Sequence, residues 1–357
     1  MTGRRQCFAE LLLAIFALSF ASVQASACDR PLRPFEILDE FSETLARWRS
    51  KDHPLQGRVW SRSAGLLLDT SERPDCCSSC DEPGYAVMID AIHDGQIVLL
   101  GEIHDNKTHH ELRAKILIAP LAAKKRDRDW PPFGVVFEQF DSGTTLQADP
   151  MQRPTNLEGF KDAVDWQKSG WSKYNYDPLL QAAIDARLPV YAGDVPRETI
   201  LKVAKEGEIA VADEEKKRLA LDISLGDKLD AASRDEIYDA HCQSMPKDAL
   251  GGIAFAQRLR DATLADNVLK AAEKHGSAIL IAGNGHVRTD RGVPWYIRQR
   301  APDKKVVSVM LIEVEEGKND PEAYVPRDPG GKPAADYIIF TPRAGRSDDP
   351  CAKFKAK

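Results

Sequence analysis

Short apolar runs alternate with longer helical patterns along most of the chain from about residue 85 onward. The runs are rich in β-branched residues, which is typical of strands buried on both faces of a sheet. They cover residues 97–100, 135–137, 190–192, 278–282, 306–314 and 337–340. Strands that alternate with helical stretches are characteristic of βαβ units. The sequence therefore predicts an α/β fold with a mostly parallel central sheet flanked by helices.

A helix start follows the first predicted strand. Thr108 and Glu111 have the spacing of a capping box, with Thr108 as the N-cap and Glu111 at the third helical position. His109 and His110 lie in the first turn of this helix. They are candidates to face a cleft, although we expect at least one of them to face solvent.

Two longer intervals, residues 141–189 and 198–276, interrupt the alternation and read as mostly helical. Inserts of this kind commonly form a helical cap subdomain over the sheet, and we expect the cap to frame a cleft. A further helix is expected over residues 35–49, ahead of the sheet.

The first 27 residues have the pattern of a secretion signal. Arg4 and Arg5 precede an apolar run over residues 11–21, and Ala25-Ser26-Ala27 is a small-residue cleavage site. The apolar run is shorter than the roughly 20 residues that a spanning helix needs. We therefore expect cleaved export and a periplasmic or secreted mature protein.

Cleavage after Ala27 would leave Cys28 as the first mature residue. Lipidation of Cys28 would make the protein an outer-membrane lipoprotein, and membrane attachment is expected only in that case. This is the minor alternative, because Ala25 stands where a lipobox has Leu and no basic patch follows to strengthen a single acyl anchor.

Composition narrows the range of partners. The net charge is −6 and no basic cluster is present, which argues against nucleic acid as a partner. Of seven cysteines, Cys76, Cys77 and Cys80 form a cluster. In an exported protein such a cluster is typical of disulfides, although the sequence does not give their pairing.

The expected organisation has four segments. They are a signal peptide (1–27), an N-terminal extension with the Cys-rich loop (28–85), an α/β domain with its helical cap (86–342) and a polar C-terminal tail (343–357).

Acidic and histidine side chains follow four of the predicted strands. Glu102 and His104 follow the first, Glu138 the second, Asp194 the third and His286 the fourth. Ligands of open parallel sheets bind at the carboxyl ends of the strands, so we expect these side chains to line one cleft. The structural alternative is that they serve the fold only; Asp194, for example, would then simply hold Arg197.

Three chemistries fit the set Glu102, His104, Glu138 and His286. One is a divalent metal site with His104, His286 and Glu138 as ligands. Another is metal-free acid–base hydrolysis, in which a His or Glu activates water. The third is binding of a larger cofactor. The sequence has no nucleophile elbow, P-loop or dinucleotide fingerprint after the first strand, which excludes serine hydrolases, kinases and dehydrogenases.

At these strand ends the sequence resembles the ChaN-like haem-binding proteins of the wider Tiki, TraB and erythromycin-esterase-like superfamily. The matching segments are Gly-Glu-Ile-His-Asp-Asn at 101–106 with the histidines at 109–110, Phe-Glu-Gln-Phe at 137–140, Tyr-Ala-Gly-Asp at 191–194 with Pro-Arg at 196–197, His241, Arg-Asp-Ala at 260–262, Ala-Gly-Asn-Gly-His at 282–286, Gly-Val-Pro at 292–294 and the closing strand at 336–342. The resemblance implies an exported or lipid-anchored protein linked to iron or haem uptake.

The resemblance also implies haem as the cofactor, a tyrosine or histidine of the cap as iron ligand, and a homodimer that shares a haem pair. Phenolate ligation of haem iron has a precedent in catalase. The candidates are Tyr174, Tyr176, Tyr238 and His241, with Asp194 and Arg197 as further cofactor-binding residues. Other branches of the superfamily use Glu and His in matching motifs for hydrolysis. A hydrolase that uses the same cleft is therefore the alternative, and whether the chain is an enzyme stays open.

Overall fold

The computed structural model describes most of the chain after residue 95 and short pieces before it. The described residues are 43–49, 53–63, 67–68, 96–123, 133–144, 146, 148–246, 249–345 and 351. All of them belong to the unit formed by residues 37–357. The expected signal peptide, Cys28, the Cys-rich loop and most of the polar tail lie outside the described residues.

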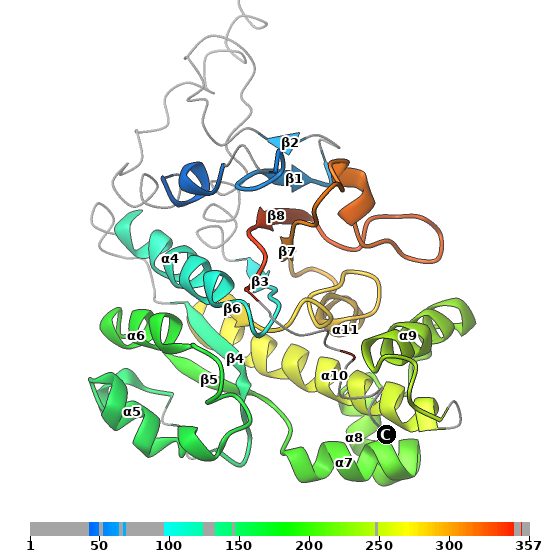
Figure 1. Ribbon diagram of the computed structural model, residues 1–357. Coiled ribbons are helices and arrows are strands. Elements are labelled where there is room, and N and C mark those ends of the chain that lie inside the picture. The colour runs from blue at the N-terminus through cyan, green and yellow to red at the C-terminus, as the bar shows by residue number, and fades with distance from the viewer. Residues whose placement is uncertain are drawn as a thin grey trace, which may run out of the picture. The chain divides into compact units, whose positions relative to one another are not determined.

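Eight strands of the described residues form one sheet (Figure 1). They are β1 (Val59–Ser61), β2 (Leu67–Leu68), β3 (Ile97–Leu100), β4 (Gly134–Asp141), β5 (Val190–Asp194), β6 (Ala278–Ile281), β7 (Val306–Glu313) and β8 (Tyr337–Thr341), in the order β2-β1-β8-β7-β3-β6-β4-β5. Strands β3 to β8 pair in parallel, and β1 and β2 extend the sheet antiparallel. The predicted α/β class and all six predicted strands are confirmed, whereas β1 and β2 were not predicted.

Helices occupy the intervals between the parallel strands. They are α4 (Lys107–Ala123), α5 (Leu157–Ala163), α6 (Asp177–Asp185), α7 (Arg197–Glu206), α8 (Asp213–Arg218), α9 (Asp227–Ala240), α10 (Leu250–His275) and α11 (Val293–Arg300). Of the helix expected over 35–49, residues 43–48 are described and are helical. None of the helices in the described residues is long and apolar enough to cross a membrane.

Both faces of the central strands are buried, which explains their uninterrupted apolar sequences. Along β3, Val98 and Leu100 pack in one core cluster with Leu112 of α4. The alternate residues of β3 pack in a second cluster with Leu264 of α10. Figure 1 accordingly shows α4 and α6 on one side of the sheet and α10 and α11 on the other.

The strand order places four functional strand ends next to one another. Strand β6 lies between β3 and β4 although it follows both along the chain. Strands β4 and β5 lie on one side of β6, and β3, β7 and β8 lie on the other. A reversal of strand order of this kind is where open α/β sheets bind ligands, beyond the carboxyl ends of the strands.

The turn from β3 into α4 differs from the prediction. Helix α4 begins at Lys107, and the side chain of Asn106 accepts a hydrogen bond from the N–H of Thr108 at 2.9 Å. Asn106 is therefore the N-cap, and the prediction that Thr108 caps the helix is wrong. The Nδ2 of Asn106 also donates to Glu313 of β7 at 2.7 Å, which ties this turn to the neighbouring strand.

A disulfide fastens the end of α9. It joins Cys242, two residues beyond the helix, to Cys351, 109 residues further along the chain. Helix α9 has no buried residue of its own, so the crosslink beyond its end adds to a sparse set of packing contacts.

Removal of this crosslink tests how much it stabilises the fold. We expect the double variant Cys242→Ser/Cys351→Ser to lose about 2–4 kcal/mol of unfolding free energy, because the unfolded chain is no longer constrained by the bond. Urea denaturation measures the loss. In a reducing buffer the wild type and the variant should unfold alike, and a difference that persists there would contradict this role.

Candidate functional site

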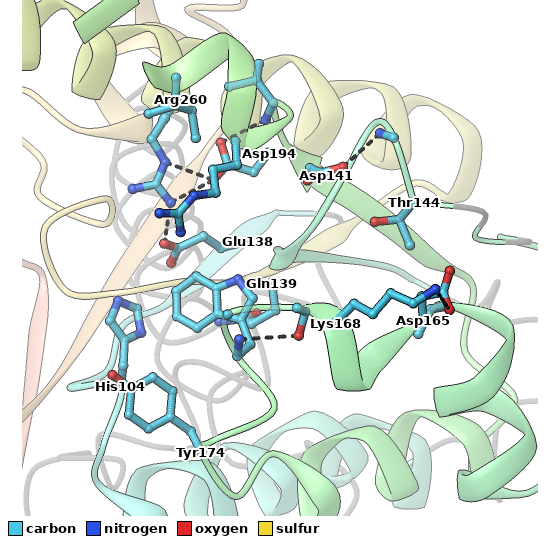
Figure 2. Close-up of a pocket in the computed structure, with 18 of the residues that line it drawn as sticks. His104, Glu138, Gln139, Asp141, Thr144, Asp165, Lys168, Tyr174, Asp194 and Arg260 are labelled. Carbon is cyan, nitrogen blue, oxygen red and sulfur yellow. Dashed lines mark hydrogen bonds and ion pairs between the residues drawn. The ribbon is translucent and has the colours of Figure 1, made fainter. Parts of the chain in front are cut away.

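An arginine joins the ends of β4 and β5. The Nη2 of Arg260, from α10, lies 2.6 Å from Glu138 Oε1 and 2.6 Å from Asp194 Oδ2, as Figure 2 shows. Asp194 therefore pairs with Arg260. The alternative that Asp194 holds Arg197 is wrong, since in the part of the chain that the structure describes the ion pair of Asp194 is with Arg260. The role of Arg260 was not predicted, although Arg260 lies in one of the segments that resemble the family.

Glu102, just after β3, is held by hydrogen bonds and ion pairs from several elements. Arg113 of α4 donates to its Oε2, and His110 Nε2 lies 2.9 Å from the same oxygen. Its Oε1 accepts from the Nδ1 of His104 at 2.9 Å and from the hydroxyl of Tyr176 at 2.5 Å. The carboxylate thus connects the β3 loop, α4 and the start of α6.

These contacts decide the charge of Glu102. Burial alone would raise its pKa, but Arg113 and the hydrogen bonds from His104 and His110 outweigh burial and hold the pKa well below its usual range. Burial and the neighbouring Glu102 charge together raise the pKa of Tyr176 far above its usual value. Glu102 is therefore a permanent anion, and Tyr176 is a neutral donor.

His104 is the member of this group that reaches the cleft. Its side chain is 35 % exposed, and its ring meets the edge of Trp171 with centroids 4.8 Å apart. On another side the ring lies against Gly283, where an added Cβ would come within 2.9 Å of Nε2. Glycine at 283 is therefore needed for the position of the imidazole.

Glu138, His286 and Asp261 form a second buried group. His286 Nδ1 lies 2.7 Å from Asp261 Oδ1, and its Nε2 lies 3.3 Å from Glu138 Oε1. Burial lowers the pKa of His286, but the Glu138 and Asp261 charges prevail and raise it to about 10. His286 is consequently a cation at neutral pH, which does not suit a general base. Asp261 was not predicted as a site residue.

The two histidines of the first turn of α4 are both fully buried, so the expectation that one faces solvent is wrong. His109 accepts from the N–H of Ile103 at 2.9 Å and donates to Thr341 at 2.7 Å. It thereby holds the β3 loop against β8. The Nδ1 of His110 lies 2.6 Å from the carbonyl oxygen of Asn175. Both rings position the loop and do not enter the cleft.

Two adjoining cavities open at this edge of the sheet. The larger has a volume of about 710 Å³, and its walls include Trp171, Tyr174, Lys168, Lys173 and Arg197. The smaller has a volume of about 430 Å³, and its walls include His241, Arg258, Arg288 and Arg291. His104, Glu138 and Arg260 line both cavities.

The four candidate haem ligands, Tyr174, Tyr176, Tyr238 and His241, do not lie in one cavity. Tyr174 lines the larger cavity and His241 the smaller one. Tyr176 is buried beneath the site on Glu102, and the half-buried Tyr238 on α9 lines neither of these two cavities.

The expected divalent metal site of His104, His286 and Glu138 is not formed. Within the described ranges, no three or more His, Cys, Asp or Glu side chains are grouped so that they could hold a metal ion. The physical reason is that guanidinium groups already neutralise the carboxylates, and both ring nitrogens of His286 face carboxylates.

A parallel sheet covered on both faces, with a charged cleft beyond its strand ends, defines an α/β ligand-binding protein or enzyme. A family model described as "Haem-binding uptake, Tiki superfamily, ChaN" matches residues 88–297. The chain therefore belongs to this family, and the predicted membership is confirmed.

One solved structure agrees with this chain in fold. ChaN of Campylobacter jejuni, solved with cofacial haem binding, superimposes with a TM-score of 0.54 at 18% identity and covers 79% of this chain and 95% of that chain. Two further structures are too distant to support an argument. An erythromycin esterase in its open conformation has a TM-score of 0.37 at 13% identity and covers 74% of this chain and 81% of that chain. A succinoglycan biosynthesis protein has a TM-score of 0.31 at 13% identity and covers 78% of this chain and 76% of that chain. No curated protein sequence matches the chain.

Breaking the buried ion pair between Glu102 and Arg113 should destabilise the protein strongly. We expect Arg113→Met to cost about 3–5 kcal/mol of unfolding free energy, because the carboxylate would stay buried without its cation. Lys168→Met is the control for an exposed pair. Lys168 is 79% exposed and pairs with the exposed Asp165, so its loss should cost about 0–1 kcal/mol. Equal losses in the two variants would contradict the importance of the buried pair.

The charge of His286 should make stability depend on pH. Because its pKa is raised in the folded state, its stabilising contribution is complete below the unfolded value of about 6.5. The contribution is lost as pH rises through about 10. The difference in unfolding free energy between wild type and His286→Asn, measured in urea across this window, should therefore shrink with rising pH. A difference that stays constant or grows would contradict the assignment.

Proposed function

We propose that this chain is an exported haem-binding protein whose larger cavity holds the haem. The observation that carries the proposal is this cavity of about 710 Å³, which presents an oriented imidazole, His104, beside aromatic and aliphatic walls. Pockets of this volume are typical of cofactor sites, and this one combines apolar walls with an equal share of polar surface. Family membership supports haem as that cofactor.

The side chains of the larger cavity fit the two chemical parts of haem. Val164, Trp171 and Ile200 offer apolar surface for a macrocycle. Lys168 and Lys173 offer positive charge for its propionates. The Nζ of Lys168 already pairs with a carboxylate in this structure, since it donates to Asp165 Oδ1 at 2.9 Å.

Haem bound here would supply an iron centre that takes a nitrogen or phenolate ligand from the protein. Two side chains of the larger cavity have suitable atoms, the imidazole of His104 and the phenol of Tyr174. The carboxylates beneath them, Glu102 and Glu138, hold and orient the surrounding groups and remain ionised.

Export is part of the proposal and rests on two observations. The N-terminal residues have the pattern of a cleaved signal. The disulfide between Cys242 and Cys351 is of a kind that forms and persists in oxidising compartments. A role in iron or haem uptake, and a homodimer that brings two haems together, follow by analogy with the family and the Campylobacter ChaN structure.

A hydrolase is the second candidate, and the pair of Glu102 and His104 favours it. A buried carboxylate that accepts from Nδ1 leaves the other ring nitrogen able to take a proton from water. An ester and peptide substrate screen distinguishes the two functions. Turnover by the wild type that disappears in His104→Ala would favour hydrolysis over haem storage or transfer.

Haemin titration of the mature protein tests the proposed function. We expect a saturable shift of the Soret band near one haemin per chain. Because Lys168 and Lys173 are exposed, replacing either with Ala should weaken the affinity by about 2–5-fold. Lys270→Ala is the matched control, since Lys270 pairs with Asp266 and lines neither cavity. Absence of saturable binding by the wild type would overturn the proposal.

A further inference from the structure

We propose that the smaller cavity is a second ligand site, which binds a small monocarboxylate that also carries a hydroxyl group. The proposal goes beyond haem binding, which concerns the larger cavity. The smaller cavity has a volume of about 430 Å³, within the range of small-molecule sites. Arg258 and His241 supply the two contacts that define the ligand, and both line this cavity without lining the larger one.

Arg258, from α10, is a cation without a carboxylate partner among the residues that the structure describes. Its guanidinium donates only to neutral oxygen atoms. Each of the other cations in the wall of the cavity contacts at least one carboxylate oxygen; they are Arg260, Arg288, Arg291 and His286. The charge of Arg258 is therefore the one in this wall that a carboxylate of a ligand would balance.

Three hydrogen bonds hold this guanidinium in place. Its Nε donates to the hydroxyl of Tyr296 at 2.9 Å. Its Nη2 donates to the carbonyl oxygens of Leu221 at 3.2 Å and Ile223 at 2.7 Å. The N–H groups of Nη1 have no partner within the described ranges. A half-buried guanidinium that is already oriented loses little freedom on binding, and its hydrogen bond to a carboxylate is charge-assisted.

His241, directly after α9, supplies a hydrogen-bond acceptor in the same cavity. Its Nδ1 lies 2.7 Å from the carbonyl oxygen of Ile237. A carbonyl oxygen only accepts hydrogen bonds, so the proton of the neutral ring is on Nδ1 and the lone pair is on Nε2. Among the described residues Nε2 has no hydrogen-bond partner. A ligand hydroxyl can therefore donate to it.

The rest of the cavity wall on this side is apolar. Leu225, Ile237 and Ala240 line it, which suits an apolar body such as an aromatic ring between the carboxylate and the hydroxyl. Helix α9, which carries Ile237 and Ala240, is tied down by the ion pair of Glu236 with Arg291 and by the disulfide beyond its end. The wall is thus fixed before a ligand binds.

Titration calorimetry with three matched compounds tests the class of ligand. The mature protein without added haemin should bind 4-hydroxybenzoate saturably, with a dissociation constant below about 1 mM. The uncharged 4-hydroxybenzamide should bind at least about tenfold more weakly, and benzoate, which lacks the hydroxyl, about 3–10-fold more weakly. Absence of saturable binding of 4-hydroxybenzoate, or equal binding of the amide, would overturn the proposal.

Single variants locate the bound compound. Arg258→Met should weaken the binding of 4-hydroxybenzoate at least about tenfold. Arg197→Met is the matched control and should leave it unchanged, because Arg197 lines only the larger cavity. The reverse result would place the anion in the larger cavity and refute the proposal. In His241→Ala the difference between 4-hydroxybenzoate and benzoate should disappear, and a difference that persists would refute the role of His241.

A pair of substitutions at Ser233 keeps the test decisive if Arg258→Met does not fold. Ser233 lies on α9 and lines the smaller cavity, where it is half-buried. Ser233→Asp adds a negative charge to the wall, whereas Ser233→Asn adds a side chain of nearly the same shape without charge. We expect 4-hydroxybenzoate to bind Ser233→Asp about fivefold more weakly than Ser233→Asn. Equal binding by the two variants would contradict a site for an anion here.

Haemin titration separates this site from the proposed function. Arg258→Met should bind haemin as the wild type does, because Arg258 does not line the larger cavity. A loss of haemin affinity in this variant would place Arg258 in the haem site and overturn the second site. If the wild type binds 4-hydroxybenzoate but not haemin, the proposed function fails and the second site stands.

Discussion

The carboxylate of Glu102 and its pairing with Arg113 organise the centre of this protein. Both side chains are fully buried, so each charge depends on the other and on neighbouring polar groups for its stabilisation. Arg113 also donates toward the carbonyl oxygens of Leu100 and Ala282, which joins α4 to the ends of β3 and β6. Because α4, the β3 loop and α6 all contribute to one carboxylate, their mutual position is fixed by a single charge.

A second ion pair repeats this arrangement on the neighbouring strands. Glu138 and Asp194 share Arg260, and Glu138 additionally accepts from the N–H of Gly283 at 2.7 Å. The carboxylates at the strand ends are thereby used as internal counterions. His104 differs from His110 and His286, since it combines a buried carboxylate partner with a partly exposed ring.

Much of the fold could be predicted from the sequence, because buried parallel strands require continuous apolar runs. The meeting of Glu102, Glu138, Asp194 and His286 at one edge followed from the parallel arrangement alone. The short strands β1 and β2 could not be predicted, since two or three residues show no periodicity. Thr108 was predicted as the N-cap because a capping box is a local sequence pattern. The actual N-cap, Asn106, is held in place by its hydrogen bond to Glu313 of a distant strand, which no local pattern shows.

The partners of the carboxylates were beyond prediction for a different reason. Arg113 and Arg260 lie within helices and are separated from Glu102 and Glu138 by 11 and 122 residues, so no local pattern pairs them with these acids. Because these arginines pair with the acids, the acids do not form the expected metal site. The predicted strand-end residues were therefore informative about the location of the site and misleading about a metal ion there.

The crystal structure of the protein in complex with haemin is the most direct test of this account. The account predicts haem in the larger cavity, with Lys168 and Lys173 beside its propionates and the hydrogen bond between His104 and Glu102 intact. Haem bound away from this cavity would contradict it.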